Sequence, residues 1–199
     1  MNTLKAEKRS MDVKAKKLRR EGYVVGNVFG REIEGSIPVK MDKLEVEKFL
    51  KKNHKGTQIM LDVEGTQYDV LIKDVMFNPI ANRVDEIDFQ ALVSNEKVHS
   101  VAEVILVNHD KVAEGVLQQH LEEISFRALP SALVDKVMVD VGEMKIGDVI
   151  KVKDLDIARD KDVDLKTDPE AIVVSLSAVH ADASLEAEES SEETTEEAK

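Results

Sequence analysis

The sequence predicts a mainly β protein with some α-helix, built from two domains and a disordered acidic tail. Aromatic residues make up 4 % of the 199 residues and Trp is absent, so the cores must rest on Val, Ile and Leu. Branched side chains favour strands because their Cβ packs well on a pleated surface. Short apolar segments separated by Gly, Asn and Pro turns recur along the chain. We expect a first domain over residues 1–93, a second, β-rich domain over 94–179 and the tail over 180–199.

The first domain should contain about five or six strands and two helices. Pro38 falls inside a strand and predicts a sheet edge, since proline cannot donate a ladder hydrogen bond. Asp42 predicts a helix N-cap, and Glu45 completes a capping box for a helix that reaches about Lys52. This content suits either a small barrel or a sheet backed by helices. The expected strands are 3–8, 23–29, 33–39, 57–63, 68–76 and 84–93.

Two of these strands carry further local signals. Gly26 interrupts the apolar run 23–29, which predicts a bulge or a close approach of another backbone. In the strand 84–93, simple alternation places Val84 on the same face as Glu86.

The N-terminal segment 1–20 holds the densest positive charge of the chain, with eight Lys and Arg against two acids. Met11, Ala15 and Leu18 are spaced i, i+4, i+7 and predict a short amphipathic helix whose other faces are basic. Gly22 is well placed to end this helix in a left-handed cap. Taken alone, the helix suits a solvated surface better than a binding site.

The second half looks like an all-β domain. Alternating apolar segments occupy 98–107 and several later stretches, whereas 116–129 is compatible with either a helix or a long strand. The junction at 94–96 is too short for a flexible linker, so the two domains should sit in a defined relation. The tail contains Glu, Ser, Thr and Ala with almost no large apolar residues and is expected to be disordered. It either shields the basic end from nonspecific binding or simply adds solubility, and the second is the simpler interpretation.

Composition excludes several function classes. The chain has no Cys, so disulfides, thiolate metal sites and cysteine nucleophiles are excluded. No apolar run is long enough for a membrane span and no signal-peptide core is visible, so a cytoplasmic protein without a membrane partner is expected. The five His residues are scattered, and no HExxH, GxSxG, Walker A or GxGxxG motif occurs. We expect neither an enzyme nor a cofactor or metal site.

Three segments carry a resemblance to a known family. They read KKLRREGYVVGNVFG at 16–30, LIKDVMFNPIANRVDEIDF at 71–89 and GVLQQHLEEISFRALPSALVDKVMVDVGEMKIGDVIKVKDL at 115–155. Together they resemble the bacterial large-subunit ribosomal protein that binds 5S rRNA, in its long two-domain form, also called general stress protein Ctc. The resemblance covers everything except the acidic tail.

The resemblance implies a fold and a function. The first domain would be a six-stranded β-barrel with helices, similar to the anticodon-binding barrel of glutaminyl-tRNA synthetase, and would bind an internal loop of 5S rRNA through the minor groove. The second domain would contact neighbouring large-subunit ribosomal proteins in the central protuberance. The chain would thus be a structural constituent of the ribosome, cytoplasmic and ribosome-associated, a monomer in isolation and not a DNA-binding protein.

The basic helix and the resemblance together supply the candidate RNA-binding residues. Lysine and arginine neutralise phosphates and set register, and the wide minor groove of RNA presents 2′-hydroxyls and base edges. Asp88 can accept a hydrogen bond from such a hydroxyl or from a guanine amino group. The candidates are Arg9, Lys14, Lys16, Lys17, Arg19, Arg20, Phe29, Gly30, Lys73 and Asp88.

The chain departs from the family pattern at three places, one of which is Val25-Gly26 where the family has Pro-Ala after the helix. Glu86-Ile87-Asp88 stands where the family has His-x-Asp, and Phe29 stands where it usually has Tyr. Together with a net charge of −12, which disfavours phosphates, these departures support an alternative. In that alternative the chain is a diverged, stress-linked accessory protein of the same fold with weak or no rRNA binding.

Overall fold

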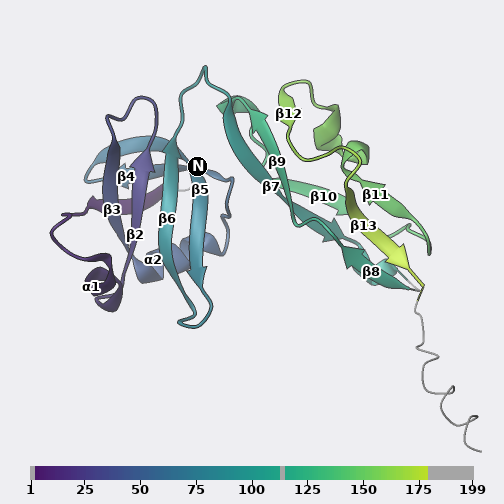
Figure 1. Cartoon of the computed structure of the whole chain (residues 1–199), viewed down its shortest axis with the longest axis horizontal. Coiled ribbons are helices and arrows are strands. Elements are labelled where there is room, and N and C mark those ends of the chain that lie inside the picture. The colour runs from purple at the N-terminus through teal and green to yellow at the C-terminus, as the bar shows by residue number, and fades with distance from the viewer. Residues whose placement is uncertain (1–2, 113–114, 179–199) are drawn as a thin grey trace, which may run out of the picture.

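The computed structural model describes residues 3–112 and 115–178, so the tail predicted over 180–199 lies outside the described residues. Two β-rich units follow one another along the chain (Figure 1). Six strands of the first unit close into a barrel in the order β1-β3-β2-β6-β5-β4. The second unit holds two smaller sheets. The predicted fold class, a mainly β protein with an N-terminal six-stranded barrel, is confirmed.

The first unit is a barrel and not a sheet backed by helices. Parallel pairings of β1 with β4 and of β2 with β6 close the ring that the antiparallel pairs begin. Its elements are β1 (Thr3–Lys8), α1 (Ala15–Arg20), β2 (Tyr23–Phe29), β3 (Ser36–Asp42), α2 (Lys43–Leu50), β4 (Gln58–Val63), β5 (Thr66–Asn78) and β6 (Arg83–Ala91).

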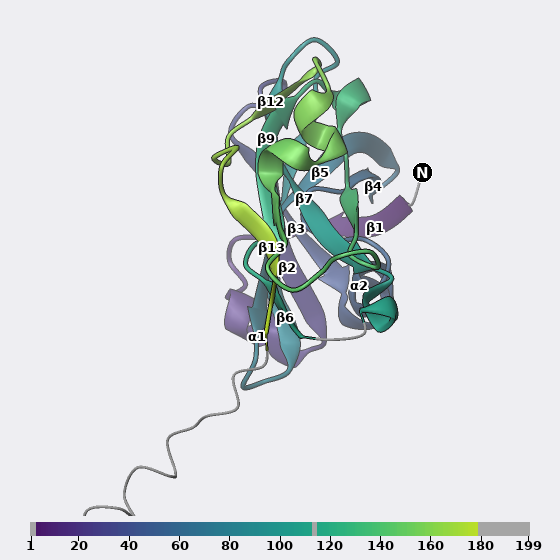
Figure 2. The same ribbon diagram turned by 90° about the vertical axis from the view of Figure 1, so that its right-hand side faces the viewer.

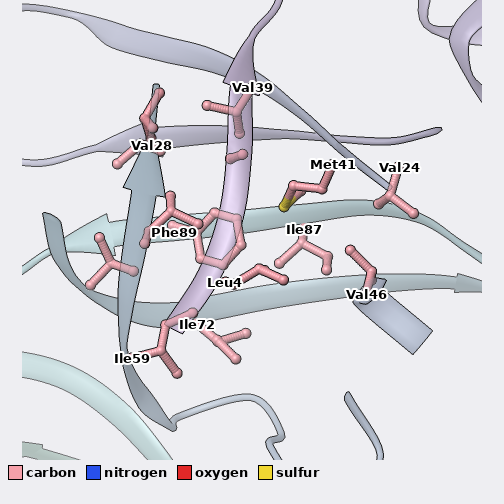
Figure 3. Packing of buried hydrophobic residues seen from close by; sticks show 14 of the residues in the cluster. Leu4, Val24, Val28, Val39, Met41, Val46, Ile59, Ile72, Ile87 and Phe89 are labelled. Carbon is pink, nitrogen blue, oxygen red and sulfur yellow. The ribbon is translucent and has the colours of Figure 1, made fainter. Parts of the chain in front are cut away.

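Inward-facing residues of the strands form the barrel core (Figure 3). Phe89 and Ile87 of β6 meet Val28 of β2, and Phe89 and Val28 are 0 % exposed. Val46 of α2 joins the same cluster, so this helix covers one end of the barrel. Burying each such side chain contributes about 1.5–3 kcal/mol relative to exposure.

The sequence signals around β3 had different outcomes. Asp42 is the N-cap of α2, because its Oδ1 accepts hydrogen bonds from the N–H groups of Leu44 (2.9 Å) and Glu45 (3.1 Å). Pro38 does not mark a sheet edge, since β3 lies between β1 and β2. Its carbonyl accepts from the N–H of Arg9, which follows the end of β1. The N–H and C=O of a strand residue point to the same side, so the missing N–H of Pro38 also faces Arg9, beyond the end of β1. The pairing of β3 with β2 is therefore undisturbed.

Strands β2 and β6 differ in regularity. Gly26 is a close approach and not a bulge, since β2 pairs with both neighbours without a register shift, and a Cβ there would lie 2.2 Å from the Ile87 carbonyl oxygen. In β6, Val84 pairs with Phe77 of β5 while Glu86 pairs with the preceding Met76, so Asp85 is an extra residue. This bulge turns Val84 inward, against the alternation expected from sequence.

The second unit consists of a four-stranded sheet, β10-β7-β9-β12, and a three-stranded sheet, β11-β13-β8. The ambiguous segment 116–129 is neither a helix nor one long strand. It forms two strands that belong to different sheets, joined where the His120 N–H bonds the Val173 carbonyl. Short 3₁₀ turns complete the unit. The elements are β7 (Val98–Val107), η1 (His109–Lys111), β8 (Val116–Gln119), β9 (Glu123–Ala128), η2 (Pro130–Ala132), β10 (Lys136–Asp140), β11 (Val149–Lys151), η3 (Val152–Asp154), η4 (Asp156–Arg159), β12 (Val163–Leu165) and β13 (Ile172–Ser177).

The two units touch at the first part of β7. The Ser100 hydroxyl donates to the Gly56 carbonyl at 3.4 Å, and a Cβ on Gly56 would lie 2.0 Å from the Val101 carbonyl oxygen. Lys55 lies 3.8 Å from the Glu123 carboxylate. These contacts give the two units the defined relation that their short junction predicts.

Within the described residues, no helix has the length and apolarity to cross a membrane. The same residues contain no group of three or more His, Asp or Glu side chains arranged to hold a metal ion.

Candidate nucleic-acid interface

Helix α1 lies on the outer wall of the barrel, against β2 (Figure 1). Leu18 and Val25 are 6 % and 2 % exposed but do not belong to the interior core, so they pack between the helix and the wall. Met11 is 73 % exposed and precedes the helix, which begins at Ala15. Gly22 has φ +92 and ends the helix as predicted.

The strands next to α1 present a row of polar side chains outward. Along the parallel pair of β2 and β6, Val25 lies opposite Glu86, Asn27 opposite Asp88 and Phe29 opposite Gln90. Because paired residues share a face of the sheet, the acids of β6 lie directly beside the strand that carries the helix.

Arg19 ties the helix to β6. Its Nε donates to the Asp85 carbonyl oxygen at 2.9 Å, and its Nη2 lies 3.5 Å from Oε2 of Glu86. The side chain is 21 % exposed. Arg19, one of the predicted RNA-binding residues, thus holds α1 on the barrel, and its contact with RNA stays a prediction.

The other cations of the helix point to solvent. Lys14, Lys16, Lys17 and Arg20 are all exposed. Lys17 forms one surface pair with Glu21, at 3.8 Å. Such exposed pairs contribute little and leave the ammonium available to a phosphate. These four residues, which we call the α1 cations, form the basic part of the interface.

Three further candidates lie outside the helix, one in the segment before it and two at the far end of β2. The Arg9 Nη2 donates to the Val13 carbonyl at 3.0 Å and braces the segment that leads into α1. Gly30 follows β2, where a Cβ would lie 2.8 Å from the Ala91 Cβ, so no larger residue fits without a shift. Phe29 ends β2 beside Gly30 and is partly exposed on the outer face.

Asp88 belongs to an acidic site that includes residues not predicted from sequence. Asn27 Nδ2 lies 3.4 Å from Glu86 Oε1 and 3.5 Å from Asp88 Oδ1, so this amide sits between the two carboxylates. Asp85 accepts from Arg83 at 2.8 Å and from Asn78 at 3.1 Å. These bonds, helped by the charge of Arg19, hold the pKa of Asp85 below its usual value. In the sequence the bulge at Asp85 shows only as Val84 falling out of phase with the inward-facing Ile87 and Phe89.

Lys73 lies away from the α1 cations, at the junction of the two units. It is the extra residue of a bulge in β5, and its ammonium donates to the His99 carbonyl of β7 at 2.8 Å. Burial, and secondarily the charge of Lys55, lower the pKa of Lys73. Whether it also meets RNA stays a prediction.

Comparison with known proteins follows the same two-part division. A model of the Ribosomal L25p family matches residues 4–89, and a model of the Ribosomal protein TL5 C-terminal domain matches residues 97–180. A Bacillus velezensis protein named Large ribosomal subunit protein bL25 is 33 % identical over 88 % of each chain. Namesakes from Bacillus pumilus, 31 % identical over 88 % of this chain and 85 % of its own, and from Caldanaerobacter subterraneus, 28 % identical over 98 % of each, also match. The chain therefore belongs to the bL25 family of large ribosomal subunit proteins, in its long, two-domain Ctc-type form.

Proposed function

We propose that this chain binds 5S rRNA in the central protuberance of the large ribosomal subunit, through α1 and the outer wall formed by β2 and β6. Its family is one of ribosomal structural proteins, which agrees with the expectation of a non-enzyme. The observation that carries the proposal is the docking of α1. Its four exposed cations lie beside strands whose outward side chains are polar.

The parts of this surface have different roles in the proposal. The α1 cations neutralise phosphates on either side of the minor groove. Asn27 and Asp88, adjacent on the wall, supply an amide and a carboxylate to 2′-hydroxyls and base edges. The second domain faces neighbouring ribosomal proteins, and the protein resides on ribosomes in the cytoplasm.

A gel-shift titration with 5S rRNA tests the proposal. We expect submicromolar binding that weakens steeply with salt, because bound cations release counterions from the RNA. Replacing Lys16, Lys17 and Arg20 together with Ala should remove most of the affinity and flatten the salt slope by about 2–3. Equal, weak binding to every RNA of the same length would contradict the proposal.

A diverged, stress-linked accessory protein is the second candidate, and the pairing of Glu86 with Arg19 favours it. This pair removes one cation from the RNA side and places an anion there. Sedimentation of a tagged protein separates the two functions. A ribosomal constituent migrates with 50S particles in growing cells, whereas an accessory protein is recovered free of them.

A further inference from the structure

A second group of lysines lies at the far end of α2. Lys48 is in the last turn of the helix, Lys51 is its C-cap and Lys52 follows, while Lys5 of β1 lies beside them. All four side chains are exposed and line one open groove, in which Glu45 is the only acid. We call these four residues the α2 patch.

The four lysines of the α2 patch are unpaired, although Glu45 lies in the same groove and Asp62 is the strand partner of Lys5. Among the described residues, none of its four side chains makes a hydrogen bond or an ion pair. The lysines on either side behave differently, since Lys43 lies 3.5 Å from Glu47 and Lys55 lies 3.7 Å from Asp74. The chain has a net charge of −12, so a cluster of unpaired cations makes the electrostatic potential locally positive on an otherwise negative protein.

The α2 patch and the α1 cations lie on different sides of the barrel. Helix α1 packs on β2, next to β6, whereas Lys5 belongs to β1. In the closed order β1-β3-β2-β6-β5-β4, two strands separate β1 from β6 in either direction, so these strands are opposite each other. Figure 2 shows α1 and α2 on different sides of the barrel. An RNA helix held on the outer face of β2 and β6 therefore leaves Lys5, Lys48 and Lys52 on another side of the barrel, whereas Lys51 also lines a groove with Arg83 at the start of β6.

We propose that the α2 patch binds the phosphate backbone of a second RNA duplex, so that the barrel bridges two RNA segments. Lys48, Lys51 and Lys52 are spaced i, i+3, i+4 and share one face of the helix end. Compact ammonium groups on flexible stems suit phosphates and read no sequence. This second RNA site is additional to the proposed function, and it rests on that function only in that the barrel is surrounded by RNA in the ribosome.

The first test uses two RNA probes on the full chain. A fragment with the 5S internal loop is bound first, and a 20-base-pair RNA duplex of unrelated sequence is then added. We expect a ternary complex, seen as a supershift, whose salt slope becomes shallower by about 2–3 in the Lys48→Ala/Lys51→Ala/Lys52→Ala variant. Binding of the first fragment should change less than twofold in this variant.

The matched control is Lys136→Ala/Lys145→Ala/Lys161→Ala, three exposed lysines of the second domain. It removes the same charge and should leave the ternary complex intact. Loss of the supershift in both variants would indicate a general charge effect and overturn the proposal. Its absence in the unmodified chain would overturn it as well.

A second test does not depend on 5S rRNA. In a chain with Lys16, Lys17 and Arg20 replaced by Ala, the unrelated duplex should still bind, and adding the three α2 substitutions should abolish that binding. If 5S rRNA fails to bind but this result holds, the proposed function fails and the α2 patch stands. If the α2 substitutions change nothing, the α2 patch only stabilises the end of its helix and the inference is wrong.

Discussion

The Arg19 guanidinium lies 3.5 Å from the Glu86 carboxylate, across the seam between α1 and β6. Both side chains are mostly covered, at 21 % and 29 % exposed. Arg19 also bonds the Asp85 backbone, so it is a positioning residue of the interface. Glu86, which departs from the His-x-Asp pattern expected from the resemblance, thus has a partner within this chain.

Replacing Glu86 with Gln should strengthen binding of 5S rRNA. The substitution removes an anion beside the phosphates and frees the outer nitrogens of Arg19. Removing the repulsion between one carboxylate and a neighbouring phosphate strengthens binding by on the order of 1 kcal/mol, or about fivefold in Kd. Gel-shift titration at several salt concentrations measures both the affinity and its slope, which should steepen.

Glu143→Gln is the control for Glu86→Gln, because Glu143 is exposed in the second domain and the change in net charge is the same. It should leave the Kd unchanged. An equal gain in both variants would show that the effect comes from net charge and not from the pair with Arg19.

The sequence was informative where local chemistry decides the structure. Asp42 identified its helix start, and Gly26 predicted either a bulge or a close backbone approach, of which the second is present. It failed where long-range pairing decides. Between the matched pairs Phe77–Val84 and Met76–Glu86, β6 has one residue more than β5, and this residue is Asp85. Alternation within β6 alone places Val84 on the wrong face.

The candidate site shows the same division. Composition marked the α1 cations, and they are exposed as expected. The role of Arg19 depends on residues 66 and 67 positions away that only the barrel brings next to it. The carbonyl that holds Lys73 lies on another domain, so its placement needed the fold.

Gly26→Ala should destabilise the barrel strongly. The added Cβ would lie 2.2 Å from a backbone oxygen of β6, which cannot move without disturbing the ladder. We expect a loss of about 2–4 kcal/mol in the free energy of unfolding, measured by urea denaturation. Gly35→Ala is the comparison, since nothing lies within 4 Å of its Cβ and only φ +77 opposes it. That change should cost about 1–2 kcal/mol, and equal losses would refute the close approach.

Glu170 should remain ionised in unusually acidic solution. Lys151 and Lys153 donate to its carboxylate at 2.8 and 2.7 Å and lower the pKa of Glu170 to about 2. The folded pKa of Glu170 lies below the unfolded value of about 4.3. The two ion pairs of Glu170 therefore stabilise the second domain above about pH 4, and this contribution is lost as the pH falls towards 2. NMR titration of the side-chain carboxyl carbon should therefore show no midpoint near pH 4 in the folded protein. In Lys151→Ala/Lys153→Ala the midpoint should return to about 4, and an unchanged midpoint would exclude the lysines as its cause.

Lys73→Met should change the relation of the two domains and not the electrostatics of RNA binding. The ammonium bonds the His99 carbonyl at 2.8 Å, and Met keeps the apolar stem while removing the donor. Small-angle scattering should detect a broader distribution of interdomain distances, whereas the salt slope for the 5S internal-loop fragment should stay the same. Lys16→Ala should give the reverse pattern. Loss of this exposed α1 cation should flatten the salt slope by about 1 and leave the scattering unchanged. If Lys73→Met instead flattens the slope with no change in scattering, Lys73 is an RNA ligand and its bond to His99 is dispensable.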